Sequence, residues 1–136
     1  MMADYFEKLF QGLKAYVSRK SIYAPYISKK AKESVFPLVV LSVSNNTNIA
    51  NLGFYEQIDM LSLTVEISTI NLEFDGEMVD AMIVANELHK LVNEYMGVMC
   101  GLKRTYDSPT PNVDKNVYRI VMRYTVKINR TKNMIY

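Results

Sequence analysis

The sequence has little of what catalysis and metal binding require. Its only cysteine is Cys100 and its only histidine is His89. A single cysteine excludes an intrachain disulfide and a cysteine-based metal cluster within one chain. The chain also lacks the glycine-rich motifs G-x-x-x-x-G-K-[ST] and G-x-G-x-x-G that cradle phosphates, and the zinc motif H-E-x-x-H. We therefore expect no catalytic residue, no metal site and no cofactor.

The few reactive side chains have ordinary structural explanations. Cys100 is expected to be a small core residue, because a cysteine nucleophile needs a nearby base and the sequence identifies none. His89 lies within a predicted helix and is expected at the surface or partly packed. Glu73 and Asp75 could form an acid–base pair, but their place beside Gly76 favours a role in a turn and at a helix start.

Long apolar runs are missing as well. The longest, residues 35–43, is the size of a strand and falls well short of the roughly 18–20 residues that span a bilayer. The N-terminal segment carries Asp4 and Glu7 and has no apolar stretch, so we expect no signal peptide and no membrane partner. A chain of 136 residues, 49% of them hydrophobic and 22% charged, fits one globular domain spanning residues 1–136.

Positive charge is almost absent from the middle of the chain. Residues 35–98 contain nine acidic side chains and only Lys90, a net charge of −8. Residues 1–34 carry +4 and residues 99–136 carry +6, which gives the total of +2. Either these charges are dispersed over solvated surfaces, or the folded protein has an acidic side and a basic side. A protein of the second kind can pair head to tail with its own copies, and such contacts make a ring where they close.

Apolar spacing predicts one helix and one strand in the first part of the chain. Over residues 3–17, apolar side chains recur three and four positions apart, which is typical of an amphipathic helix. Residues 18–34 are basic and rich in Ser, Tyr and Lys, and we expect a connection there, with room for a turn of helix at 28–33. Residues 36–43 are apolar and β-branched, which predicts a buried strand with Pro37 at its start.

A long polar segment follows that strand. Residues 44–57 contain four asparagines and a glycine, which favours a loop, because asparagine side chains bond to nearby backbone and tolerate left-handed geometry. Loops of this length in small domains are often functional or disordered. We therefore place candidate contacts in this loop, at Asn45, Asn46, Asn48, Phe54 and Tyr55.

The second half of the chain predicts further strands and one more helix. Residues 58–70 alternate between apolar and polar side chains, as in a strand with one packed and one solvent-facing side. The resulting order α-β-β-α-β-β predicts an α+β fold, an antiparallel sheet of about four strands with two helices packed on one face. After residue 70 we expect a turn at Asp75-Gly76, a helix over 77–97 that ends at Gly97 or Gly101, a strand over 101–107, a turn-rich connection over 108–116 and a strand over 117–128.

Basic residues mark one side of the last strand. Arg119, Arg123 and Lys127 are four positions apart, so they share a face of that strand, and Tyr118 and Tyr124 fall on the opposite, packed face. The stripe is either a solvated sheet face, a contact with an acidic partner such as a neighbouring copy, or a contact with phosphates. We rank nucleic acid lower, because its binders usually interleave aromatic residues with basic ones on the same face.

The layout resembles a known family, and the last third of the chain carries most of the likeness. Gly101-Leu102-Lys103-Arg104 is followed by Asp107-Ser108-Pro109, an Asn/Asp-rich connector, and then Tyr118-Arg119 and Arg123-Tyr124. Together with the order of the helices, the strands and the Asn-rich loop, these segments resemble the tail terminator proteins of long-tailed phages and phage-tail-like particles. Such proteins are also described as tail-completion, minor capsid or neck proteins. The resemblance covers nearly the whole chain.

The resemblance implies structural work. Members of that family form a ring, commonly a hexamer, on the last ring of the tail tube, where it stops tube growth and offers a docking surface to neck proteins. The implied partners are copies of this chain, the tail tube protein, a neck or head-completion protein and, in contractile particles, the sheath protein, with DNA only in passage. The implied location is the virion tail or neck, assembled in the host bacterial cytoplasm. The loop over 44–57 would reach the tube or a neighbouring copy and become ordered on assembly.

Other functions stay open beside this one. A head–tail connector or head-completion protein is the main structural alternative, and a small nucleic-acid-binding protein and an enzyme are the others. They differ in what they bind: a tail tube, a portal or adaptor, a nucleic acid, or a substrate. Besides the loop residues, the candidate interface residues are Arg119, Arg123, Lys127, Lys103, Arg104, Glu66 and Glu73.

Overall fold

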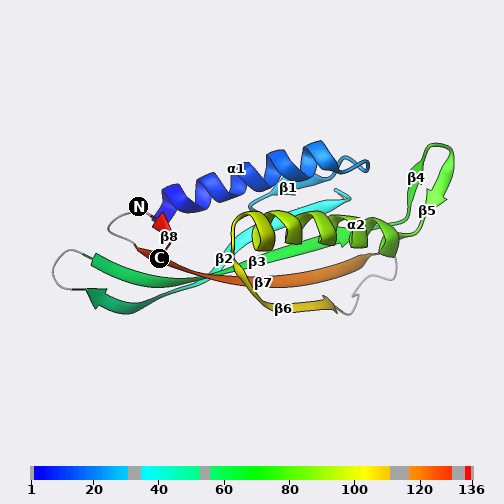
Figure 1. Ribbon diagram of the computed structural model, residues 1–136. Helices are drawn as coiled ribbons and strands as arrows, with labels where there is room; N and C mark the ends of the chain where they lie inside the picture. The colour runs from blue at the N-terminus through cyan, green and yellow to red at the C-terminus, as the bar shows by residue number, and fades with distance from the viewer. Residues whose placement is uncertain (1, 31–34, 53–55, 111–116, 130–133, 136) are drawn as a thin grey trace.

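Two helices cover one face of a long sheet, and the opposite face of the sheet is free of helices (Figure 1). The computed structural model describes residues 2–30, 35–52, 56–110, 117–129 and 134–135. Only the backbone is described in residues 2–4, 45–52, 56–58, 110, 128–129 and 134–135. The mixed α+β class and the two helices on one face are as predicted.

The sheet differs in detail from the predicted antiparallel sheet of four strands. Its strand order is β1-β2-β3-β7-β6, and the short β8 pairs with β7. β1 runs parallel to β2, and the other neighbours are antiparallel, so the sheet is mixed. The extra strand β1 lies in the stretch predicted as a connection, where three residues are too few for a recognisable pattern. The strands are β1 (Tyr26–Ser28), β2 (Leu38–Leu52), β3 (Glu56–Thr69), β6 (Lys103–Thr110), β7 (Tyr118–Asn129) and β8 (Met134–Ile135).

The predicted loop over residues 44–57 is wrong. β2 runs on to Leu52 and pairs with β3, so most of that segment belongs to a long hairpin that extends past the helices (Figure 1). Two register shifts, after Val43 and after Asn48, mark β-bulges in the Asn-rich part. Asparagine disfavours strands only weakly, and pairing with a partner strand overrides that preference.

The amphipathic pattern of the first helix is confirmed. α1 (Met2–Lys20) buries Leu9, Phe10, Leu13 and Val17 against the sheet and the second helix. These side chains recur at helical spacing, so a single stripe of α1 supplies one wall of the core.

The second helix begins later than predicted. α2 (Ala81–Asn93) starts after a small hairpin, because residues 77–79 pair as β5 (Glu77–Val79) with β4 (Leu72–Phe74). Asp75 and Gly76 form the predicted turn, and both have positive φ, 53° and 81°, as a two-residue hairpin turn requires. The helical path continues as a π-helix, η1 (Glu94–Met99), and stops before Gly101, which has a φ of 72°.

The core lies between the helices and the sheet. Leu61, Leu63, Val65 and Ile67 of β3 are fully buried, and so is Tyr124 of β7. The alternation predicted for both strands is therefore confirmed, and it decides which side chains point away from the helices.

Candidate functional site

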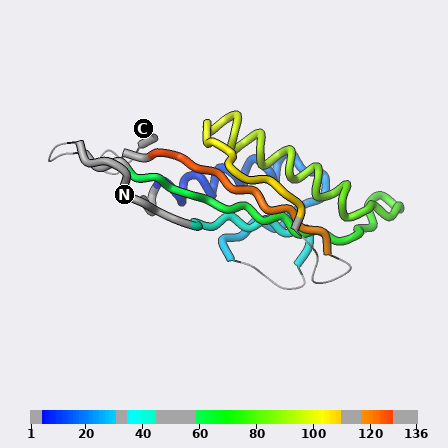
Figure 2. The backbone as a smooth tube through the Cα atoms, turned by 90° about the horizontal axis from the view of Figure 1, so that it is seen from below, coloured from blue at the N-terminus to red at the C-terminus, as the bar shows by residue number. Residues whose placement is uncertain are grey.

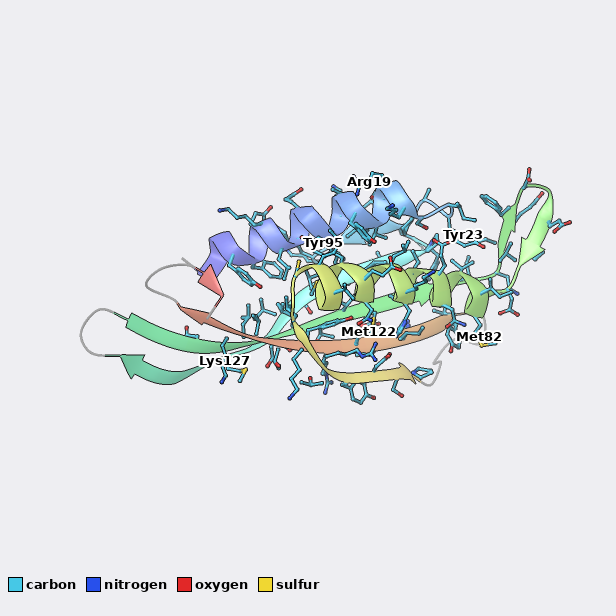
Figure 3. All side chains as sticks on the ribbon, viewed as in Figure 1. Arg19, Tyr23, Met82, Tyr95, Met122 and Lys127 are labelled. Atoms are coloured by element: carbon cyan, nitrogen blue, oxygen red, sulfur yellow. The ribbon has the colours of Figure 1, made fainter. Side chains whose placement is uncertain are left out.

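The side of the sheet without helices carries a cluster of cations. Residues on β7 that alternate with the buried ones point to this side, and Lys127 lies below the sheet in Figure 3. Arg123 is paired across the sheet with Thr64 of β3, and Lys127 with Met60. The predicted stripe of basic residues on β7 is therefore present on one uncovered face.

A neighbouring strand adds to this cluster. Lys103 of β6 pairs with Thr125, which lies between Arg123 and Lys127 on β7. Lys103, Arg123 and Lys127 are exposed, and Arg119 is partly buried. We call the surface formed by Lys103, Arg119, Arg123 and Lys127 the basic face.

A shallow depression of ≈ 570 Å³ opens on the basic face. Both charged and apolar side chains line it, among them Lys103, Lys127 and Met60. A surface of this kind can receive an acidic partner whose contact also includes apolar groups. Its lining residues are Met60, Gly101, Lys103, Thr105, Thr125, Val126 and Lys127.

An aromatic residue that the sequence did not point to lies on the same face. The Tyr106 ring is 5.0 Å from the guanidinium carbon of Arg123, a distance typical of a cation–π contact. A β-bulge between Arg104 and Tyr106 brings it there, because Tyr106, not Thr105, pairs with Arg123. Plain alternation after Arg104 would have placed this ring beside Met122 in the core.

Most cations of the basic face have no acidic partner. Glu66 lies on the same side of the sheet, with Oε1 3.9 Å from Nε of Arg119. That Nε is buried and makes no hydrogen bond. Among the residues that the structure describes, no carboxylate forms an ion pair with Lys103, Arg123 or Lys127. The basic face therefore keeps most of its charge available to a partner.

Arg104 does not belong to the basic face. It pairs with buried Tyr124, which turns it to the helix side of the sheet, and its Nη1 lies 3.3 Å from Oδ2 of Asp107. The same carboxylate oxygen is 2.7 Å from Nε2 of His89 on α2. His89 is partly buried, as expected, and the three polar side chains fasten the edge strand β6 to α2. Arg104 thus has a structural role in this chain.

The remaining predicted contacts are scattered. Glu73 is exposed on β4, in the small hairpin at the end of the molecule, away from the basic face (Figure 1). Asn45, Asn46 and Asn48 are strand residues of β2, paired with Ser62, Leu61 and Asp59, and only their backbone is described. Phe54 and Tyr55 lie outside the described residues.

Cys100 borders an apolar cavity between α1 and η1. The cavity has a volume of ≈ 330 Å³ and is lined by Tyr5, Leu9, Tyr95 and Met99, with Lys8 at its edge. Burial raises the pKa of the Cys100 thiol above its usual value. Thiols become nucleophiles as thiolates, so this environment lowers the reactivity of Cys100. The expectation of a small core residue holds in part, since the side chain packs against the core but is not fully buried.

Within the described ranges of the chain, no three His, Cys, Asp or Glu side chains lie together so as to hold a metal ion. No helix among those residues is long and apolar enough to cross a bilayer. No family model and no curated protein sequence matches this chain.

Proposed function

We propose that this protein is a structural subunit that assembles with its own copies into a ring on the head-proximal end of a phage, or phage-tail-like, tail tube. There the ring ends tube polymerisation and offers a docking surface to neck proteins. The tail tube protein and a neck protein are its partners, and the sheath protein is a further one in contractile particles. The virion tail or neck is its place of action.

The basic face is the observation that carries this proposal. Three cations on neighbouring strands of one uncovered sheet face have no described acidic partner. They are held on paired strands, so their spacing is set by the backbone. A rigid and charged surface of this kind suits a protein contact with a fixed register. The order of elements, which resembles that of the tail terminator family, supports the same conclusion.

A second candidate function is binding to nucleic acid. The ring of Tyr106 lies among the cations of the basic face, and an aromatic residue interleaved with basic ones is the pattern that such binders use. The sequence ranks nucleic acid lower because Tyr118 and Tyr124 of β7 lie on the packed face. Tyr106 of β6 lies on the basic face instead.

Imaging with purified tail tubes tests the proposal. Tubes incubated with the protein are expected to show an extra ring at one end only and to stop elongating when free tube subunits are added. A chain that leaves tube ends bare and tube growth unchanged is not a terminator. In parallel, gel shifts with duplex and single-stranded DNA at two salt concentrations test the second candidate, since phosphate contacts weaken steeply with added salt.

A further inference from the structure

The small β4–β5 hairpin is a projecting acidic surface. It extends beyond the end of the sheet on the side of the helices (Figure 1). Glu73, Asp75 and Glu77 are all exposed, and among the described residues none of them makes a hydrogen bond or an ion pair with another side chain. The hairpin thus presents several charges of one sign that no side chain in the described part of the chain neutralises.

Exposed apolar side chains lie next to these acids. Met78 on β5 is 69% exposed, and Phe74 on β4 is 38% exposed. Met82 and Ile83 in the first turn of α2 are exposed as well, and Figure 3 shows Met82 at this end of the molecule. Methionine and aromatic side chains are enriched in protein interfaces, where they fill irregular depressions.

The hairpin is held firmly to the rest of the domain. Oγ1 of Thr69 donates a hydrogen bond to the carbonyl of Ala81 (2.7 Å), and Oδ1 of Asn71 accepts one from the amide of the same residue (2.8 Å). The ring of Phe74 meets that of Tyr23 edge-on, with centroids 5.3 Å apart. The acidic side chains therefore project from a fixed base and not from a loose loop.

The acidic hairpin and the basic face cannot neutralise each other within one chain. The hairpin rises on the helix side of the sheet, whereas the basic face looks away from the helices, and the view from below in Figure 2 places the hairpin at one end of the molecule. Two different patches that complement each other on one molecule favour a heterologous contact between copies, which produces a ring or a filament.

We propose that the β4–β5 hairpin of one copy docks on the basic face of the next copy. Glu73 and Met78 are paired across the hairpin and therefore share its outer face. Glu73 meets Lys103 or Lys127, and Met78 enters the depression lined by Met60. This inference rests on the proposed ring and names the surfaces that build it. The proposed partner is a second copy of this chain. Its hairpin carries negative charge that complements the cations of the basic face and an apolar side chain that fits the depression there.

The contact between two copies should be weak, and the closed ring stable. A hairpin of this length covers much less than the roughly 800 Å² per partner of a standard interface. In a closed ring each subunit makes the contact twice, so the last contact forms within one assembly and benefits from a high effective concentration.

Carbodiimide cross-linking tests the contact with the native chain, because this reagent joins a carboxylate to an amine only where the two groups touch. We expect links between Glu73 and Lys103 or Lys127. Mixing isotopically heavy and light protein distinguishes a link between copies from a link within one copy. Links that lie only within single copies, or that join other surfaces of two copies, would overturn the docking.

Charge reversal supplies the second test. Lys103→Glu with Lys127→Glu should weaken association at least about tenfold in sedimentation velocity, as should Glu73→Lys on the hairpin face that carries Met78. An equimolar mixture of these two variants should associate again, with the variants alternating, because the altered hairpin matches the altered face and the unaltered hairpin matches the unaltered face. The matched control for the basic face is Lys8→Glu with Lys14→Glu, which changes the net charge equally on exposed positions of α1 and should associate like the wild type.

The outcomes separate this inference from the proposed function. Rings that cap tube ends but are insensitive to the reversals on the hairpin and the basic face would keep the function and reject this contact. Wild-type protein that stays monomeric at every concentration rejects the contact, whatever the tube images show. If reversal of the basic face removes DNA binding and leaves assembly intact, the surface belongs to a nucleic acid and not to a second copy.

Discussion

Gly12 marks the closest approach between α1 and the helical segment that packs on it. A Cβ atom at this position would lie 1.8 Å from Oη and 2.7 Å from Cζ of Tyr95. The Tyr95 ring cannot easily move away, because it packs against Tyr16 with ring centroids 5.8 Å apart. The glycine that lowers helix propensity in the sequence is therefore needed for packing.

We expect Gly12→Ala to destabilise the protein. The gain of about 1 kcal/mol in helix propensity is outweighed by overpacking, which typically costs about 1–3 kcal/mol. Urea unfolding should show a lower midpoint for the variant. Tyr95→Phe removes the nearest atom, so adding it to Gly12→Ala should cost less than the sum of the two single changes. A Gly12→Ala protein as stable as the wild type would contradict this account.

The buried Tyr124 and the partly buried Tyr5 and Tyr95 make the free energy of unfolding depend on pH in the alkaline range. Burial raises the pKa of Tyr5 and of Tyr124 to about 12, and it raises the pKa of Tyr95 as well. The fold thus favours the neutral phenols, whereas in the unfolded chain they ionise near pH 10. The stability that these phenols contribute is fully present below about pH 10. It is lost as the pH rises toward 12, because in this range only the unfolded state releases their protons.

Absorbance at 295 nm and circular dichroism, followed together from pH 8 to 13, measure this effect. A fraction of the tyrosine absorbance change should appear only as the fold is lost, because the pKa values of Tyr5, Tyr95 and Tyr124 are raised. In Tyr124→Phe the late fraction should be smaller. Complete ionisation near pH 10 with an intact fold would show that these phenols are not buried as described.

Asp80 caps the start of α2, beside Asn71, which accepts a hydrogen bond from the amide of Ala81. Asp80 has an extended backbone conformation, and its Oδ1 accepts a hydrogen bond from the amide of Met82 at 2.8 Å. This cap lies directly between β5, which ends at Val79, and the first residue of α2, Ala81.

We expect Asp80→Ala to lower the free energy of unfolding by about 1 kcal/mol, because a helix amide loses its acceptor. Asp80→Asn should cost much less, since asparagine caps nearly as well, and the comparison separates the cap from the charge. Thermal unfolding of the two variants is the measurement. Equal losses in both would mean that the negative charge, and not the hydrogen bond, stabilises this helix start.

For the molecule as a whole, the arrangement of charge matters more than the net charge of +2. Negative charge gathers on the hairpin and positive charge on the uncovered side of the sheet. An association that depends on these surfaces is screened by salt, since the Debye length falls from about 10 Å at 0.1 M to about 3 Å at 1 M.

We therefore expect self-association of the wild type to weaken as sodium chloride rises from about 0.05 to about 0.5 M. This range includes the physiological ionic strength of roughly 0.15 M. Light scattering over this range measures it. Association driven mainly by the apolar side chains near Met78 would instead be unchanged or stronger at high salt.

Local patterns were enough to predict much of this protein. The stripe of α1, the alternation from Leu61 to Ile67 and the Asp75-Gly76 turn each depend on neighbouring residues, so the sequence alone identifies them. The shared face of Arg119, Arg123 and Lys127 follows from the same alternation.

Pairing between distant strands required the folded structure, because cross-strand hydrogen bonds can override weak local preferences, as in the Asn-rich part of β2. The bulge in β6 is of the same kind: it reverses the alternation after Arg104, moves Tyr106 to the basic face and leaves Arg104 bound to Asp107 on the other side.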